Sequence, residues 1–308
     1  MIVDAVVSAA SLTLVVMVGA YLVGVTDRAT AHVVAHRPLR VGHLLADPVR
    51  RAAALMLQGH STTERPDAGA LAFAPVLLGG AGLAAIAAIP LTDGVAVADI
   101  PDGIALYGAA LAMVLVAVFL HGWAPNSPFP LLGAYRFAAQ ALSYPIPFVL
   151  TLISTALKAQ SLSVGGIVAS QAHLWNVLRQ PIGLPLFLVT GGALAFWGPF
   201  DLPDAADLAG GTTAEISGRA LLAWQIARAT VLVSVAAMAA AAFLGGGFGP
   251  ALPAAVWMAL KTLVVLVVLV AGGHLVARVR IERFVTVCWT VLIPLALVDV
   301  FVSGALAL

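Results

Sequence analysis

The densest group of acidic residues in this chain lies in one polar segment, GPFDLPDAADLAGGTTAEISGR, which separates two apolar stretches. The segment contains no basic residue before its last position, Arg219. Crowded carboxylates raise one another's pKa and can exchange protons. The same charges would also suit a solvated loop whose acids cap helices, which is the commoner origin of a charge run. Both interpretations concern Asp201, Asp204, Asp207 and Glu215.

Three further ionisable residues, Arg228, Lys261 and Asp299, fall inside long apolar stretches. A charge at the centre of a bilayer costs at least about 2.5 kcal/mol, so such residues normally face a bundle interior or a wet cavity. We therefore treat them as candidates for a buried polar path, with Asp299 as the partner of the two cations. Alternatively, the Arg228 side chain extends to the interface and Asp299 is partly hydrated near the outer end.

Other kinds of site find no support in the residue pattern. The chain has no nucleophile elbow, phosphate loop or nucleotide fingerprint. Its seven histidines show no metal-ligand spacing, and its one cysteine, Cys288, argues against a disulfide or a cysteine-ligated cluster. The net charge is +1, and no basic stretch is interleaved with aromatic residues. We expect no metal, no nucleic-acid partner and no self-contained active site.

The composition identifies the elements that must position these residues. The chain is 62% hydrophobic and 9% charged, whereas soluble domains carry about 25% charged residues. A helix needs about 20 apolar residues to cross a bilayer, so we predict an all-α, multi-pass protein with one membrane domain, 1–308. Its eight expected spans are 2–25, 69–91, 103–124, 134–157, 180–198, 219–245, 252–274 and 281–305.

Two of these spans have unusual features. The span 134–157 contains Pro145 and Pro147, which neighbouring helices can accommodate, and the span 180–198 is short. The N-terminus lacks the basic region of a signal peptide, so we interpret it as a retained first span.

Basic residues predict the orientation. In the eight-span arrangement most Lys and Arg fall on one side, and the other side has only Lys158 and Arg179. The positive-inside rule then makes the loops 26–68 and 199–218 cytoplasmic and places both termini outside. The segments 44–57 and 163–178 are amphipathic and would suit helices lying flat on the membrane, although ordinary connectors are the alternative.

Seven stretches together resemble the H subunit of respiratory complex I, the proton-pumping NADH–quinone oxidoreductase. This membrane subunit is called subunit 1 in mitochondria. The stretches occur in family order and cover nearly the whole chain, and the family has eight spans with both ends outside. They are LRVG (39–42), LLAD (44–47), HGWAPNSPFPLLGAYRFAAQALSYP (121–145), SQAHLWNV (170–177), PFDLPDAADLAGGTTAEISG (199–218), GPALPAAVWMALKT (249–262) and RVRIERFVTVCWTVLIPLAL (278–297).

The resemblance implies a role at the joint between the peripheral redox arm and the membrane arm, in the inner (plasma) membrane. The family's cytoplasmic loops wall a chamber for a quinone, which is the substrate. NADH, flavin and iron–sulfur clusters would bind only to partner subunits, and the other membrane partners are small and antiporter-like subunits. The acidic loop would couple quinone reduction to proton movement. The residues that match are Asp201, Asp204, Asp207 and Glu215 in that loop, Arg40 and Arg136 on the chamber side, and Lys261 in the LKT phrase.

The departures from the family pattern concern its proton route. Pro145 and Arg228 stand where the family usually has glutamate. Arginine cannot release its proton at physiological pH, so we expect the family's usual route from the chamber to be cut or rerouted in this chain. The other departures are Trp197 and Gly198 before PFD, Ala206 in an acidic loop one residue shorter, and Arg50, Arg51 and Gln58 after LLAD.

Two alternatives stay open at this point. A membrane anchor of an energy-converting hydrogenase, such as a formate hydrogenlyase, shares the fold and needs no quinone. A stand-alone transporter would use Lys261, Arg228 and Asp299 to line a substrate path, but matching pairs of broken helices are not evident in the sequence.

Overall fold

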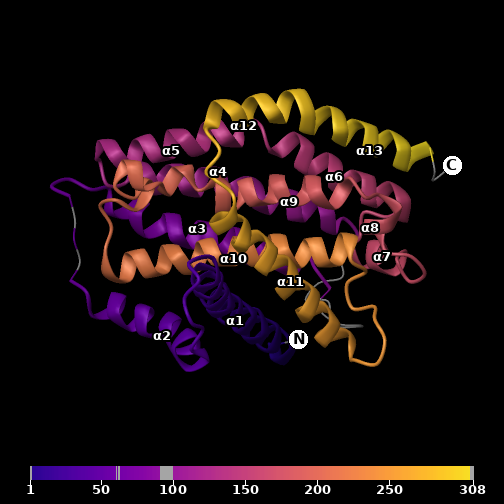
Figure 1. The fold of residues 1–308 in the computed structure, drawn as a ribbon, viewed down its shortest axis with the longest axis horizontal. Helices are drawn as coiled ribbons and strands as arrows, with labels where there is room; N and C mark the ends of the chain where they lie inside the picture. Colours follow the sequence, from indigo (N-terminus) through magenta and orange to yellow (C-terminus); the bar gives the residue numbers. More distant parts are fainter. Residues whose placement is uncertain (1, 60, 62, 91–99, 306–308) are drawn as a thin grey trace.

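The computed structural model describes residues 2–59, 61, 63–90 and 100–305, and all regular elements in these ranges are helical (Figure 1). Six apolar helical stretches are long enough to cross a membrane. This confirms the all-α class and a membrane protein with several spans. The six stretches are α1 (Ile2–Val34), α3 (Ala68–Ala87), α4 (Gly103–Trp123), α10 (Gly218–Phe243), α11 (Ala254–Leu275) and the continuous run Ile281–Ala305.

The predicted fourth span, 134–157, is wrong as a single helix. It consists of α5 (Pro128–Ala141) and α6 (Pro145–Ala159), which are bent by 43°. Proline has no amide hydrogen and suits the first turn of a helix, so the chain restarts a helix at Pro145. The bent pair counts as one further span by length and composition.

The predicted fifth span is represented by α9 (Gly183–Leu194), a helix of 12 residues. A helix of this length falls short of the about 20 residues that cross a bilayer. The count of eight spans and the side of each terminus therefore stay predictions. Residue 91, the predicted end of the second span, lies outside the described residues.

The first helix is longer than predicted. α1 continues to Val34, so the connection between the first two spans starts nine residues later than the predicted loop 26–68. It contains α2 (Val41–Leu57), which confirms a helix over 44–57 and has no buried residue. The segment 163–178 is not one flat helix, because α7 (Val164–Ala169) and α8 (Asn176–Arg179) are separate short helices.

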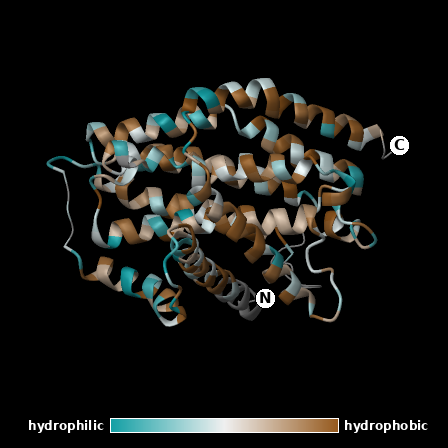
Figure 2. Ribbon diagram, in the orientation of Figure 1, coloured by the Kyte–Doolittle hydropathy of each residue, from teal (hydrophilic) through white to brown (hydrophobic). Residues whose placement is uncertain are grey.

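α10 forms the centre of the bundle (Figure 1), and hydrophobic residues dominate the helices around it (Figure 2). Lipid tails are as apolar as leucine, so such helices are held by close packing rather than by exclusion of water. A Cβ on Gly82 of α3 would stand 2.9 Å from Thr230 Cγ2 of α10. Glycine therefore sets the distance between these two helices.

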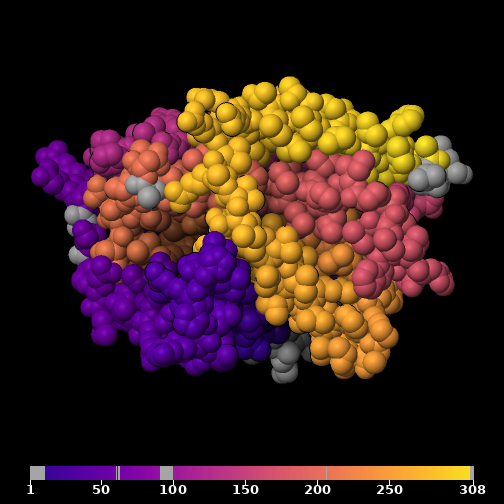
Figure 3. All heavy atoms as spheres, viewed as in Figure 1, coloured from indigo at the N-terminus to yellow at the C-terminus, as the bar shows by residue number. Residues whose placement is uncertain are grey.

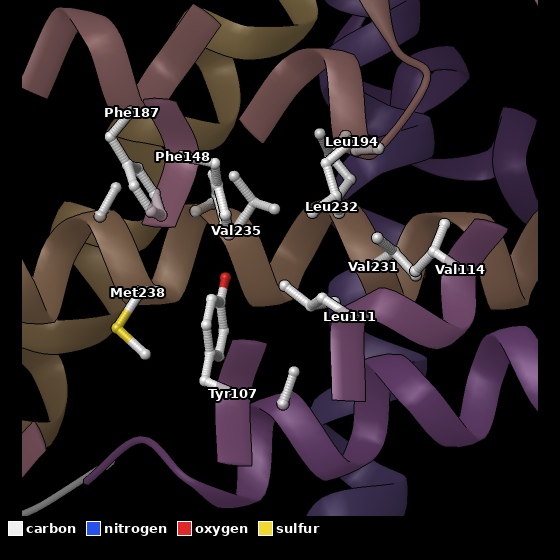
Figure 4. Packing of buried hydrophobic residues seen from close by; sticks show 14 of the residues in the cluster. Tyr107, Leu111, Val114, Phe148, Phe187, Leu194, Val231, Leu232, Val235 and Met238 are labelled. Atoms are coloured by element: carbon white, nitrogen blue, oxygen red, sulfur yellow. The ribbon is translucent and has the colours of Figure 1, made fainter. Parts of the chain in front are cut away.

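Aromatic side chains fill one side of this core (Figure 4). Phe148 of α6 stacks on Phe187 of α9 with 4.9 Å between ring centroids. Tyr107 of α4 points toward α10 and donates a hydrogen bond to the Ser234 carbonyl oxygen at 3.3 Å. The phenol thus satisfies its polar group inside the apolar core.

The last long run contains a π-helical turn, Cys288–Leu292, between α12 (Ile281–Val287) and α13 (Ile293–Ala305). These helices lie along one edge of the bundle (Figure 1). Within the described residues, α13 packs mainly on α6.

The acidic segment folds as four 3₁₀ turns, η1 (Gly198–Phe200), η2 (Leu202–Asp204), η3 (Ala206–Leu208) and η4 (Gly211–Thr213). Gly211 has φ +56°, and a Cβ there would stand 1.7 Å from the Pro203 carbonyl oxygen. Only glycine permits this crossing of η2 and η4. The segment is thus a packed structure against α5 rather than a solvated loop.

Two polar loops predicted on the same side of the membrane meet in the structure. The Ser217 hydroxyl accepts a hydrogen bond from the Ser61 amide at 2.8 Å and donates one to the Gly59 carbonyl oxygen at 3.0 Å. The end of the acidic segment is therefore attached to the connection that follows α2.

Candidate functional site

A cavity of about 590 Å³ lies between α1, α2, α10 and α11, beside the start of the acidic segment. Figure 3 shows a hollow where the indigo N-terminal helices meet the orange and yellow segments. Much of its wall is apolar, with Met17, Val23, Met56, Ile226 and Val270 among its residues. Its polar and ionisable lining residues are Tyr21, Asp27, Arg51, Asp201, Gln225, Arg228 and His274.

Arg228 lines this cavity and contacts the acidic segment. Its guanidinium donates to Asp204 Oδ2 at 3.1 Å and to the Phe196 carbonyl oxygen. The group also lies 4.5 Å from the ring centroids of Phe196 and Trp197. Cation–π contact and an ion pair together hold it beside the loop. Trp197, noted above only as a departure from the family pattern, supplies half of this aromatic clamp.

A second polar pair in the cavity was missed by the sequence analysis. His274 Nε2 near the end of α11 lies 2.9 Å from Asp27 Oδ1 of α1. Both side chains are partly exposed, 28% and 39%. The residues are 247 positions apart, and no local motif connects them.

Each acid of the segment has a different partner. Arg278, in the connection between α11 and α12, donates two hydrogen bonds to Asp201, at 2.6 and 2.9 Å. Asp207 receives two from Arg136 of α5, at 3.1 and 2.8 Å. The Glu215 carboxylate accepts one from Ser127, which precedes α5, at 3.0 Å. The segment therefore connects three parts of the chain.

The expected mutual effect of crowded carboxylates is minor in this arrangement. Burial is the main cause that raises the pKa of Asp204, whereas Arg228 and Thr212 lower it. The charge of Asp201 also raises this pKa and is the smallest of the four effects. The hydrogen bonds from Arg136 lower the pKa of Asp207. Asp201 raises the pKa of Arg278. Separation onto different partners explains why crowding is not the leading effect.

Arg136 and Arg40 occupy different places. Arg136 is tied to the acidic segment through Asp207 and, at 3.5 Å, through the Leu202 carbonyl oxygen. Arg40 is exposed immediately before α2 and lines a separate cavity of about 300 Å³ with His32 and other residues of the first connection. The structure does not place it among the residues of the larger cavity.

Lys261 and Asp299 lie apart from Arg228, so the three residues form separate clusters. Lys261 Nζ donates to the carbonyl oxygens of Leu244, Gly246 and Phe248 at 2.6, 2.9 and 2.6 Å. It also lies 4.2 Å from the ring centroid of Trp175. The expected pairing of Asp299 with Arg228 or Lys261 is wrong, because the Asp299 carboxyl accepts a hydrogen bond from Ser154 instead. Asp299 is also buried, at 5% exposure, rather than hydrated.

Within the described part of the chain, no group of three or more His, Cys, Asp or Glu residues could hold a metal ion. The cavity itself presents hydrogen-bond donors, carboxylates and an imidazole beside an apolar wall.

Comparison with known proteins identifies relatives along most of the chain. A family model described as NADH dehydrogenase matches residues 7–304. The chain is 34% identical over 258 residues to the H subunit of the NADH-quinone oxidoreductase of Anoxybacillus flavithermus, with 81% of this chain and 77% of the relative covered. It is 34% identical over 255 residues to the same subunit from Geobacillus kaustophilus, with the same coverage. The corresponding protein of Bacillus thuringiensis matches at 34% over 258 residues, again with the same coverage.

Proposed function

This chain belongs to the NADH dehydrogenase family, and we propose that it forms the quinone chamber of a complex-I-type NADH–quinone oxidoreductase in the inner membrane. The observation that carries this proposal is the cavity between α1, α2, α10 and α11. A quinone has an apolar tail and a head whose two carbonyl oxygens accept hydrogen bonds. The apolar wall of the cavity suits the tail, and its ionisable residues suit the head.

The pair of Asp27 and His274 offers a proton donor at this cavity. Reduction of a quinone to a hydroquinone takes up two electrons and two protons. The electrons would come from the redox arm of the assembly. In this proposal the imidazole donates one proton to a head-group oxygen, and Asp27 orients the ring through their contact. The second proton would come from solvent that reaches the partly exposed pair.

The acidic segment would pass the effect of quinone reduction to other helices. Asp201 and Arg228 line the cavity, and their partners lie in the connection 276–280 and in η2. A change of charge in the cavity would alter the electric field at Asp204, the ion-pair partner of Arg228. Of these two groups, only the aspartate can change its protonation state. We propose that this network, with Arg136, Asp207 and Glu215, couples quinone chemistry to proton movement.

The proposed chamber can be tested with two substitutions to tryptophan on the same helix. Ala52 of α2 lines the cavity, whereas Ala54 is exposed and does not. Ala52→Trp should abolish or strongly reduce quinone reductase activity of the purified assembly and its labelling by a photoreactive quinone. Ala54→Trp is the matched control and should keep both. Equal activity and labelling in the two variants would refute the chamber.

The partners can be tested by purifying the tagged chain in mild detergent and identifying what accompanies it by mass spectrometry. We expect iron–sulfur and flavin subunits of the redox arm together with other membrane subunits. A nickel–iron hydrogenase subunit in their place would refute the complex-I assignment in favour of the hydrogenase type. A stable chain without partners would refute both.

A further inference from the structure

Asp299 is a buried carboxyl group without an ion-pair partner among the described residues. It lies in α13 at 5% exposure, and the ion pairs of the described chain do not include it. Lys158, in the last turn of α6, influences it through its charge, but the Lys158 ammonium donates its hydrogen bond to the Arg179 carbonyl oxygen at 3.0 Å. An isolated carboxylate in an apolar interior is costly and is normally neutralised.

A chain of polar side chains surrounds this carboxyl. Ser154 Oγ of α6 donates to Asp299 Oδ2 at 2.6 Å. Gln180 Oε1, between α8 and α9, lies 3.3 Å from Ser154 Oγ and 3.3 Å from Ser303 Oγ of α13. Ser154, Gln180 and Ser303 are at most 2% exposed. Three separate parts of the chain therefore converge on one buried polar cluster.

Two features distinguish this cluster from a structural contact in which every polar atom has a hydrogen-bond partner. Gln180 Nε2 is buried and has no hydrogen-bond partner, so the cluster keeps a spare donor. A Cβ on Gly183 would stand 3.4 Å from Asp299 Oδ2 and 2.9 Å from Phe243 Cε1. The start of α9 thus approaches the carboxyl closely and seals it with apolar atoms.

A buried carboxylate can be neutralised by a proton or by a metal cation. The 2.6 Å spacing of Ser154 Oγ and Asp299 Oδ2 is that of a direct hydrogen bond. No metal ion fits between these two oxygens. The positive charge of Lys158 also disfavours a second fixed cation nearby. The geometry therefore favours a proton.

We propose that Asp299 is a proton-binding site within the membrane. The carboxylate takes up one proton to form the neutral acid and releases it again to the side of the membrane where α6 ends. Ser154 holds the carboxyl by a hydrogen bond, and Gln180 and Ser303 extend the polar cluster beyond it. Lys158, half-buried between the cluster and the surface, controls the exchange through its charge. This inference is independent of the quinone cavity.

The other charged groups near the site are few. The elements that pack most on α13 are α6, the π-helical turn and α9. α6 contributes Lys158, α9 has no ionisable side chain, and Cys288 of the π-helical turn lies about three turns away along the helix. Glu282 and Arg283 of α12 lie still further along. Arg179 of α8 acts on Lys158.

The test uses dicyclohexylcarbodiimide, an apolar reagent that reacts with protonated carboxyl groups inside membranes. The intact assembly in native membrane vesicles is treated over a range of pH, and adducts are located by mass spectrometry. We expect an adduct on Asp299 that declines as pH rises and is absent in Asp299→Asn. Asp299→Glu should still react. Glu282→Gln, which changes an exposed acid of α12, should leave the adduct unchanged.

Infrared difference spectra supply a second readout that involves neither quinone nor activity. The carbonyl band of a protonated carboxyl group should be lost in Asp299→Asn and shift to higher frequency in Ser154→Ala, because a hydrogen bond to the carbonyl oxygen is removed. The proposal is overturned by no adduct at any pH together with unchanged spectra in Asp299→Asn. Protection of Asp299 by Na⁺ at constant pH and ionic strength would overturn it in favour of a metal cation.

Discussion

Arg228 and Asp204 form an ion pair at 3.1 Å that joins α10 to the preceding acidic segment. The side chains are 17% and 8% exposed, so both charges are largely withdrawn from solvent. A cation with its own counterion thus lies next to the cavity. The pair is neutral as a unit and holds η2 against α10.

Arg228→Met should destabilise the protein by about 3–5 kcal/mol, because it leaves the Asp204 carboxylate buried without a partner. Thermal unfolding of the purified protein in detergent measures this loss. The double variant Arg228→Met with Asp204→Asn should recover much of it, since no unpaired charge remains. A double variant as unstable as the single one would contradict this account.

The loss in Arg228→Met should also depend on pH. Burial raises the pKa of Asp204, so protonation occurs at higher pH than for an exposed aspartate. A protonated Asp204 carries no buried charge, and the destabilisation should shrink as pH falls through that raised pKa. Unfolding midpoints of the variant and the wild type, compared across the acid range, provide the check. A difference that stays constant with pH would be inconsistent with this cause.

Asp207→Asn should have a small effect that disappears in acid. The Asp207 side chain is 59% exposed, so its pairing with Arg136 contributes at most about 1 kcal/mol. The hydrogen bonds from Arg136 lower the pKa of Asp207 below 3.8. Its contribution is therefore full above the unfolded-state pKa and is lost as pH falls through the lower folded-state pKa. Wild type and variant should converge there in urea-induced unfolding.

His274→Gln should impair quinone reduction, because His274 and Asp27 line the cavity. It should change the stability of the protein little, because both side chains are partly exposed. We expect a lower kcat and a smaller change in KM, since a donor of a proton is lost while the apolar wall remains. Steady-state quinone reduction by the purified assembly measures both. Unchanged kcat would remove His274 from the proposed mechanism.

Gly211→Ala should destabilise the acidic segment by about 1–3 kcal/mol, because alanine is strained at φ +56° and its Cβ would collide with the Pro203 carbonyl oxygen. Gly108→Ala in α4 is the control, since a Cβ there meets nothing within 4 Å. Thermal unfolding should separate the two variants clearly. Equal midpoints would show that η2 and η4 tolerate displacement.

The sequence by itself determined the membrane class, the family and the positions of most helices. Apolar stretches of about 20 residues have few alternatives to a spanning helix, because a bilayer offers no partner for free backbone groups. Pro145 also indicated a disturbance in the fourth span. The sequence did not predict that the chain would form two helices with a 43° bend between them, because neighbouring helices decide whether a proline kinks a span or divides it.

Only the tertiary structure decided which charges meet. Asp201, Asp204 and Asp207 are close in sequence, but their partners come from the connection after α11, from α10 and from α5. Asp27 and His274 meet across almost the whole length of the chain. Asp299 accepts a hydrogen bond from Ser154 instead of forming an ion pair among the described residues. Helix packing sets these pairings, and packing depends on the shapes of many side chains that no local pattern records.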